Sequence, residues 1–175
     1  MPVSVFVGTS LDGFIARLDG TFDFLSAHGG EEPHGYEEFF ATVDAVVMGR
    51  NTFEVVAAFP SWPFEGKRVV VLSARPVDSA RVGSGKFEQM SGEPAEIVAQ
   101  LAASGTHHLY VDGGITVQRF INAGVVDRIT ITRVPVLVGS GIPLFGVVPR
   151  DTPLRHLKTQ TYSTGLVKSE YEVVK

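Results

Sequence analysis

The chain has 175 residues, which suits one domain and is short for two, so we expect a single domain over residues 1–175. Apolar residues make up 44% and charged residues 19% of the sequence, a balance that excludes a disordered chain. The net charge of −4 argues against nucleic-acid or anionic-membrane partners. The lack of cysteine excludes disulfides and thiolate chemistry, and the histidines lack ligand spacing, so we expect no metal site. The sequence shows no signal peptide and no apolar run of roughly 18 residues, which predicts a cytoplasmic protein.

Strand and helix patterns alternate through the first 125 residues. Apolar alternation or continuous apolar runs predict strands at Val3–Val7, Ala45–Met48, Arg68–Leu72 and His108–Asp112. Helical spacing predicts helices at 36–43, 51–57, 93–103 and 117–124. Asn51 with Glu54 resembles a capping box, and Ser91 or Gly92 precedes the third of these helices.

The last 50 residues are richer in strand patterns. A long strand is predicted over Arg128–Val138, with an irregularity at Pro135, and a hairpin around Thr164–Gly165 ends the chain. Together the elements predict an α/β fold, a three-layer αβα arrangement whose mostly parallel sheet ends in an antiparallel hairpin.

Ligands of such sheets bind beyond the carboxyl ends of the strands, so the loops that follow the strands are the candidate site. Gly49-Arg50-Asn51-Thr52 and Asp112-Gly113-Gly114-Ile115-Thr116 each follow a strand and open a helix. Free N–H groups and the helix dipole bind phosphate there. Ser73 and Arg75 follow another strand and suit a ribose phosphate. The combination predicts a dinucleotide that carries an extra 2′-phosphate, although glycines at such turns are common in α/β proteins.

These motifs, with Ser10-Leu11-Asp12-Gly13-Phe14-Ile15-Ala16, Met48-Gly49-Arg50, Val71-Leu72-Ser73 and the segment Asp127–Phe145, resemble the dihydrofolate reductase superfamily. The similarity is greater to the C-terminal reductase domain of bifunctional riboflavin-biosynthesis deaminase/reductases and to its stand-alone relatives, and it covers residues 3–174. The resemblance implies a dihydrofolate-reductase-like fold, NADPH as cofactor, and a homodimer, for which the apolar segment Val134–Phe145 is a candidate interface.

The resemblance also implies roles for individual residues. The cofactor-binding residues would be Gly49, Arg50, Thr52, Leu72, Ser73, Arg75, Asp112, Gly113, Gly114, Ile115 and Thr116. The substrate-binding residues would be Ser10, Leu11, Asp12, Gly13 and Ile15. A cis peptide is expected between Gly113 and Gly114, where glycine reduces its steric cost.

The reaction that this resemblance implies is hydride transfer from NADPH to a C=N bond, either in a heterocycle or in the ribosyl imine of a ribosylamino-pyrimidine, as in 5-amino-6-(5-phosphoribosylamino)uracil reductase. The nitrogen must then be protonated, and Asp12 is the first candidate acid, ahead of Asp23, Glu37 and Glu38. Asp12 equally fits a turn-capping role beside Gly13. Two alternatives stay open. One is dihydrofolate reductase activity, although segment 27–38 departs from the folate pattern, and the other is a non-catalytic NADP(H)-binding module.

Overall fold

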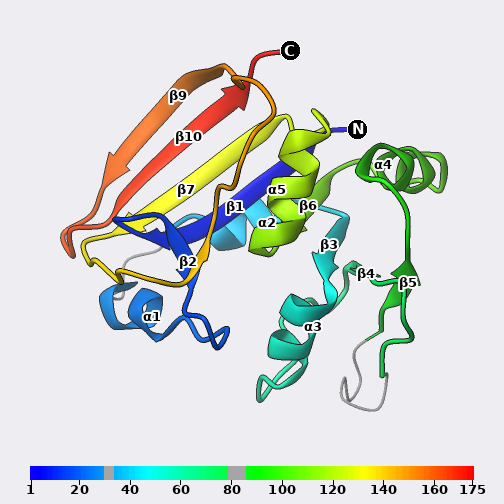
Figure 1. The fold of residues 1–175 in the computed structure, drawn as a ribbon, viewed down its shortest axis with the longest axis horizontal. Helices are drawn as coiled ribbons and strands as arrows, with labels where there is room; N and C mark the ends of the chain where they lie inside the picture. Colours follow the sequence, from blue (N-terminus) through cyan, green and yellow to red (C-terminus); the bar gives the residue numbers. More distant parts are fainter. Residues whose placement is uncertain (30–33, 79–85) are drawn as a thin grey trace.

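The computed structural model describes residues 1–29, 34–78 and 86–175, and an eight-stranded sheet in the order β5-β4-β3-β6-β1-β7-β10-β9 forms its centre (Figure 1). The strands are β1 Val3–Ser10, β3 Ala45–Gly49, β4 Arg68–Leu72, β5 Glu88–Met90, β6 Leu109–Asp112, β7 Arg128–Val134, β9 Leu154–Thr161 and β10 Val167–Val173. From β5 across to β7 all neighbours are parallel, whereas β10 is antiparallel to both β7 and β9. The predicted sheet is therefore confirmed.

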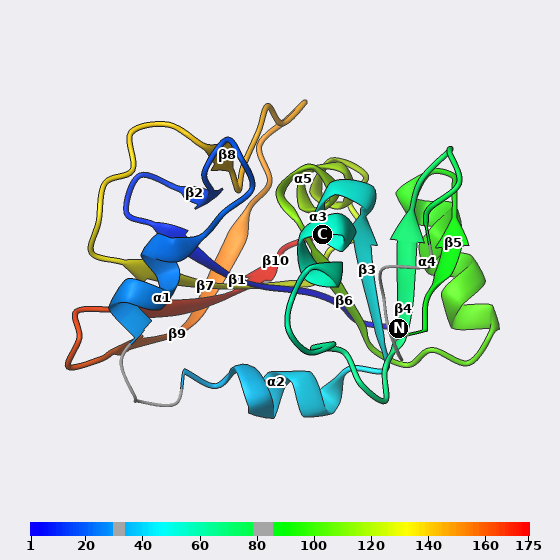
Figure 2. The same cartoon turned by 90° about the horizontal axis from the view of Figure 1, so that it is seen from below.

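Helices cover both faces of the sheet. They are α1 Asp23–Gly29, α2 Tyr36–Thr42, α3 Arg50–Ala57, α4 Pro94–Ala103 and α5 Gly114–Asn122. On one face, α3 packs Phe53 and Val56 beside α2, which Figure 2 shows beneath the sheet. On the other face, α4 and α5 pack Leu101 and Phe120 into a second core. This is the predicted three-layer αβα arrangement.

The short strand β3 is apolar at every position because both of its faces are buried. Side chains alternate between the faces of a strand, so Ala45 and Val47 join the core under α4 and α5, while Val46 and Met48 join the core under α2 and α3. All four residues are fully buried. An uninterrupted apolar strand therefore indicates a sheet covered on both faces.

A second, two-stranded sheet stands over the end of β1 and was not predicted. Its strands, β2 Phe14–Ala16 and β8 Ile142–Pro143, pair antiparallel. A Cβ at Gly141 would overlap the carbonyl oxygen of Ala16, so glycine permits this close pairing. The sequence analysis also missed α1 and β5, which are short elements.

Two predicted helices begin within one residue of the predicted positions, but their capping differs from the prediction. The helix α3 begins at Arg50 after an extended Gly49, and Glu54 forms an ion pair with Arg50 instead of a capping box with Asn51. The helix α4 has Glu93 as its N-cap, in a capping box with Glu96. Neither Ser91 nor Gly92 caps it.

The segment from Val134 to Phe145 leaves the sheet and then turns along the surface. The strand β7 ends at Val134, not at Val138, because Pro135 has no N–H to donate to a ladder. Val134 and Leu144 are buried, whereas Leu137 is 70% and Phe145 46% exposed. The predicted homodimer through this segment stays a prediction. Among the described residues, no helix is long and apolar enough to cross a membrane.

Candidate functional site

Two strand-to-helix turns meet above the carboxyl ends of β3 and β6, which pair in parallel. The turn before α3 contains Gly49 and Thr52, and the turn before α5 contains Gly113 and Thr116. A Cβ at Gly49 would come within 2.9 Å of Oγ1 of Thr116, and a Cβ at Gly113 would overlap Oγ1 of Thr52. Each turn therefore packs its threonine against the other turn's glycine. The two sequence motifs predicted to act together are indeed neighbours in space.

The N-termini of both helices are open toward this junction. Neither Gly49 nor Gly113 provides a side-chain cap, so the first-turn N–H groups of α3 and α5 remain available to an anion. The predicted cis peptide is wrong, because the bond between Gly113 and Gly114 is trans. Gly113 instead turns the backbone through a φ of +90° and a ψ of 136°, a conformation suited to glycine. Ile115, on the first turn of α5, is 65% exposed.

The loop after β4 forms a tight turn at the surface. Oγ of Ser73 donates to the carbonyl of Arg75 at 2.6 Å and accepts the Arg75 N–H at 3.1 Å. The side-chain amide of Gln89 donates to the carbonyls of both residues, at 2.9 and 3.0 Å. Arg75 is exposed, whereas Leu72 lines the cavity described next. A role of Ser73 and Arg75 in binding a 2′-phosphate stays a prediction.

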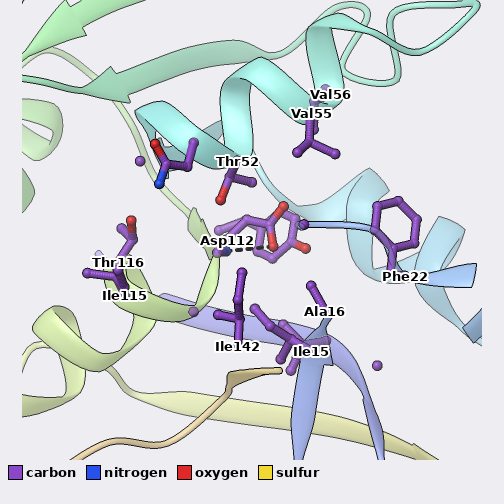
Figure 3. A pocket seen from close by; sticks show the side chains of 18 of the residues that line it. Ile15, Ala16, Phe22, Thr52, Val55, Val56, Asp112, Ile115, Thr116 and Ile142 are labelled. Atoms are coloured by element: carbon purple, nitrogen blue, oxygen red, sulfur yellow. Dashed lines mark hydrogen bonds between the residues drawn. The ribbon is translucent and has the colours of Figure 1, made fainter. Parts of the chain in front are cut away.

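A cavity of about 700 Å³ extends from the two turns toward α1 and β2 (Figure 3). Thr52 and Thr116 lie at the end formed by the turns, and Asp112 lies between the two ends. Phe22 lines the opposite, apolar end, and Ile15 of β2 lies between the two ends, where its side chain reaches Gly114. The cavity thus joins a polar end at two helix N-termini to an apolar end, with the carboxyl group of Asp112 between them.

Asp112, the last residue of β6, is the acid among the described residues that line this cavity. Burial raises the pKa of Asp112 above its ordinary 3.8, although the carboxylate accepts the N–H of Gly113 at 2.8 Å. Two tyrosines lie nearby. Burial, followed by the charge of Asp112, raises the pKa of Tyr36 to about 12, and burial likewise raises the pKa of Tyr110. The hydroxyl of Tyr110 donates to the carbonyl of Phe6 at 3.0 Å. Asp112 therefore holds its proton more readily than an exposed acid, and the tyrosines stay neutral.

The structure assigns Asp12, the predicted acid, a different role. Its carboxylate accepts the N–H groups of Val138 and Gly139, at 3.1 and 2.8 Å, and thereby anchors the segment after β7. A hydrogen bond from Ser10, together with these two amides, lowers the pKa of Asp12 to about 2. Asp12 lies outside the cavity lining. An exposed carboxylate that stays ionised is a poor proton donor, so the prediction of Asp12 as the catalytic acid is corrected in favour of turn capping.

The other residues of the first loop divide between the cavity and the turn. Ile15 lines the cavity with Ala16. Oγ of Ser10 accepts the N–H of Phe14 at 3.0 Å, and Gly13 has a φ of +88°, so both shape the turn. Leu11 is 58% exposed. Of the predicted substrate-binding residues, only Ile15 lines the cavity, and the substrate contacts stay a prediction.

The weaker acid candidates also lie outside the cavity lining. Asp23 forms a two-bond ion pair with Arg17, at 2.7 and 3.0 Å. Glu37 and Glu38 are exposed on α2. Residues 30–33 of the segment that departs from the folate pattern lie outside the described residues. Across the described part of the chain, no group of three His, Asp or Glu side chains could hold a metal ion.

The apolar end of the cavity was missed by sequence reasoning. Its wall includes Phe22, Leu25, Val55, Phe59 and Pro63. The available signal was the apolar cluster at residues 22–25, directly before and within α1. That cluster is too short to show a helical period, so it did not identify an element.

A mostly parallel sheet with paired glycine turns beside a cavity at its carboxyl edge defines a dihydrofolate-reductase-like fold. A structure of Enterococcus faecalis dihydrofolate reductase, complexed with NADP(H), shares this fold at a TM-score of 0.70, with 15% identity over 99% of this chain and 97% of that one. More specifically, the chain belongs to the RibD C-terminal domain family, a family of reductase domains, which it matches over residues 2–168.

Two relatives cover nearly the whole chain. The uncharacterized protein YwjB of Bacillus subtilis is 34% identical over 160 residues, which are 90% of each protein. A crystal structure from Shewanella sp. PV-4, of a protein provisionally named for riboflavin biosynthesis, superimposes with a TM-score of 0.91 at 34% identity and covers all of both chains. The predicted family and fold are confirmed.

Proposed function

We propose that this protein is an NADPH-dependent reductase that transfers hydride to a C=N bond of a heterocyclic or ribosylamino-pyrimidine substrate. The observation that carries the proposal is the junction of the two glycine turns, which opens two helix N-termini onto a cavity whose described lining includes the carboxyl group of Asp112. Membership of a family of reductase domains supports it. So does the NADP(H) complex of the dihydrofolate reductase that shares the fold.

The residues at the junction fit such a cofactor. Side chains at Gly49, Gly113 or Gly114 would meet neighbouring atoms at 2.9 Å or less, so the absence of a Cβ keeps the backbone N–H groups accessible. The turns Gly49–Thr52 and Gly113–Thr116 would hold the pyrophosphate. Ser73 and Arg75 would hold the 2′-phosphate, because a guanidinium forms strong charge-assisted hydrogen bonds with phosphate. When bound, the reduced nicotinamide supplies the hydride.

The protein's own contribution is to orient the substrate, exclude water and deliver a proton. Hydride addition to C=N leaves an electron-rich nitrogen that must be protonated. Asp112 would hold that proton on its carboxyl group, since burial raises its pKa. Tyr36 and Tyr110 stay neutral beside it and supply hydroxyl groups without competing for the proton.

Cofactor binding is tested first. The chain has a single tryptophan, Trp62, whose fluorescence serves as the reporter. Trp62 packs edge-on against Phe53 of α3, with ring centroids 6.3 Å apart, so energy transfer from Trp62 to reduced nicotinamide reports binding. We expect NADPH to bind and Gly114→Val to weaken it at least tenfold, because the new side chain would meet Ile142 and Pro143. Ala102→Val, an exposed change on α4, is the matched control and should leave binding unchanged.

Turnover is then followed by the absorbance of NADPH, with dihydrofolate and with 5-amino-6-(ribosylamino)uracil, with and without its 5′-phosphate. Oxidation with any of these, lost in Asp112→Asn, supports the reductase. Tight NADPH binding without turnover of any substrate would favour the non-catalytic binding module. Failure to bind NADPH would contradict both.

A further inference from the structure

The apolar end of the cavity is lined by aliphatic and aromatic side chains. Leu25 and Val55 form its wall from α1 and α3, and Phe59 closes it from the segment after α3. Phe22 meets Phe59 edge to face, with ring centroids 5.9 Å apart, although Phe59 remains 38% exposed (Figure 3 shows Phe22). Apolar side chains left open to solvent around a cavity are typical of a ligand site.

Aromatic side chains also form the floor of the cavity beside Asp112. The ring of Tyr36 lies 5.7 Å from that of Phe6 and 6.4 Å from that of Tyr110, both edge to face. Both tyrosines line the cavity, and the charge of Asp112 acts on the pKa of each. Rings of this kind contact a flat heterocycle, and a protonatable carboxyl group can hydrogen-bond to nitrogen or oxygen atoms at its edge.

The distribution of charge disfavours an anionic substrate. Among the described residues that line the cavity, the cationic side chains are those of Arg50 and Arg119. Arg50 pairs with Glu54 at 2.9 Å, and Arg119 donates to the carbonyl of Gly92 at 3.2 Å. Both arginines belong to the helices whose N-termini form the cofactor end. A phosphate monoester carries roughly −1.5 to −2 charges at neutral pH and would face apolar side chains and Asp112 at the other end.

We propose that the substrate is an uncharged, flat aromatic heterocycle without a phosphate group, bound between Phe22, Val55 and the aromatic floor. This inference rests on the proposed function, because it assigns the apolar end of the cavity to the hydride acceptor. It also narrows that function, since it excludes phosphorylated ribosylaminopyrimidines as preferred substrates.

A matched pair of ligands tests the proposal. Binding of 5-amino-6-(ribosylamino)uracil and of its 5′-phosphate is measured by isothermal titration calorimetry, with and without saturating NADP⁺. We expect the uncharged compound to bind at least tenfold more tightly than the phosphate. Equal binding, tighter binding of the phosphate, or no binding of either compound would overturn the proposal.

A variant with an added charge sharpens the test. Phe59→Arg places a cation at the rim of the apolar end. It should reduce the preference for the uncharged compound over its 5′-phosphate, or reverse it. Val147→Arg adds the same charge at a side chain that is 90% exposed and outside the cavity lining, so it should leave the preference unchanged. A preference that moves equally in both variants would show that overall charge, not the cavity, sets it.

The two proposals fail separately. If the uncharged heterocycle binds but NADPH does not, the assignment of the apolar end stands and the reductase is refuted. If NADPH binds and the phosphorylated compound is preferred, the reductase stands and the substrate class is refuted.

Discussion

Replacing Gly113 with alanine probes the contact that joins the two turns. The φ of +90° and ψ of 136° lie in a region that L residues rarely adopt, and a side chain there costs about 1–3 kcal/mol. The new methyl group would also overlap Oγ1 of Thr52, and such overpacking costs about 1–3 kcal/mol. Because these costs have separate causes, we expect Gly113→Ala to lower the free energy of unfolding by roughly 2–6 kcal/mol.

A double-mutant cycle separates the two costs. In the Thr52→Ala background the overlap with Oγ1 is gone, and the Cβ of residue 52, 3.2 Å away, remains as a tight contact. The backbone strain also remains, so Gly113→Ala should cost less there, about 1–3 kcal/mol. Urea denaturation of the wild type, both single variants and the double variant measures the difference. Gly66→Ala is the matched control, because Gly66 has a φ of +75° and no atom within 4 Å of its Cβ position. An equal cost of Gly113→Ala in both backgrounds would refute the contact between the turns.

Three further predictions concern individual charged groups. Arg75→Ala should weaken NADPH binding by roughly ten- to a hundredfold and leave NADH binding unchanged, because NADH lacks the 2′-phosphate. Both cofactors are titrated at two ionic strengths, and equal weakening of the two would contradict this prediction. At pH values above 3.8, Asp112→Asn should raise the melting temperature relative to the wild type, because a raised native pKa makes the ionised carboxyl group destabilising. The difference in melting temperature should vanish at pH values below 3.8. Asp12→Asn should lower the melting temperature at neutral pH, because its lowered pKa of about 2 reflects a carboxylate that stabilises the fold. The difference in melting temperature between variant and wild type should shrink as the pH falls from 3.8 toward 2, and a pH-independent difference would contradict the role of the charge. At neutral pH, Asp12→Asn and the wild type should bind NADPH with the same affinity.

The fold and the junction of the two glycine turns could be predicted because their signals are local. Gly49 and the pair Gly113-Gly114 each stand between an apolar strand and an amphipathic helix, so strand, turn and helix are read from adjacent residues. Parallel strands place such turns at one edge of a sheet whatever the details of packing. The sequence could not show that Thr52 contacts Gly113, since that contact depends on the spacing of two strands.

The errors arose where distant segments determine the outcome. Asp12 was predicted as an acid from its position after the first strand, but its amide partners, Val138 and Gly139, lie 126 and 127 residues along the chain. The pairing of Phe14–Ala16 with Ile142–Pro143 is equally distant, and both strands are too short to show a period. Residue type and spacing cannot identify such partners.

The sequence located Asp112 but could not show how strongly it holds its proton. The sequence placed it in a cofactor motif, because it directly precedes Gly113. Its raised pKa comes from burial, in surroundings that include Tyr110 of its own strand and Tyr36 of α2. The sequence therefore located the residue but could not show its protonation behaviour, which decides between a cofactor contact and a proton donor.

The two ends of the cavity are maintained by opposite means, and this difference bears on what the site is for. At the end formed by the two turns, their junction excludes side chains at Gly49 and Gly113, so backbone groups remain accessible without loss of packing. At the other end, Phe59 stays 38% exposed and Phe22 is only partly buried, so apolar area remains in contact with water. Each 100 Å² of such area forgoes about 2.5 kcal/mol of burial free energy in the unliganded protein. A bound ring would recover part of this free energy, so the incomplete packing of the aromatic wall is physically consistent with a ligand that completes it.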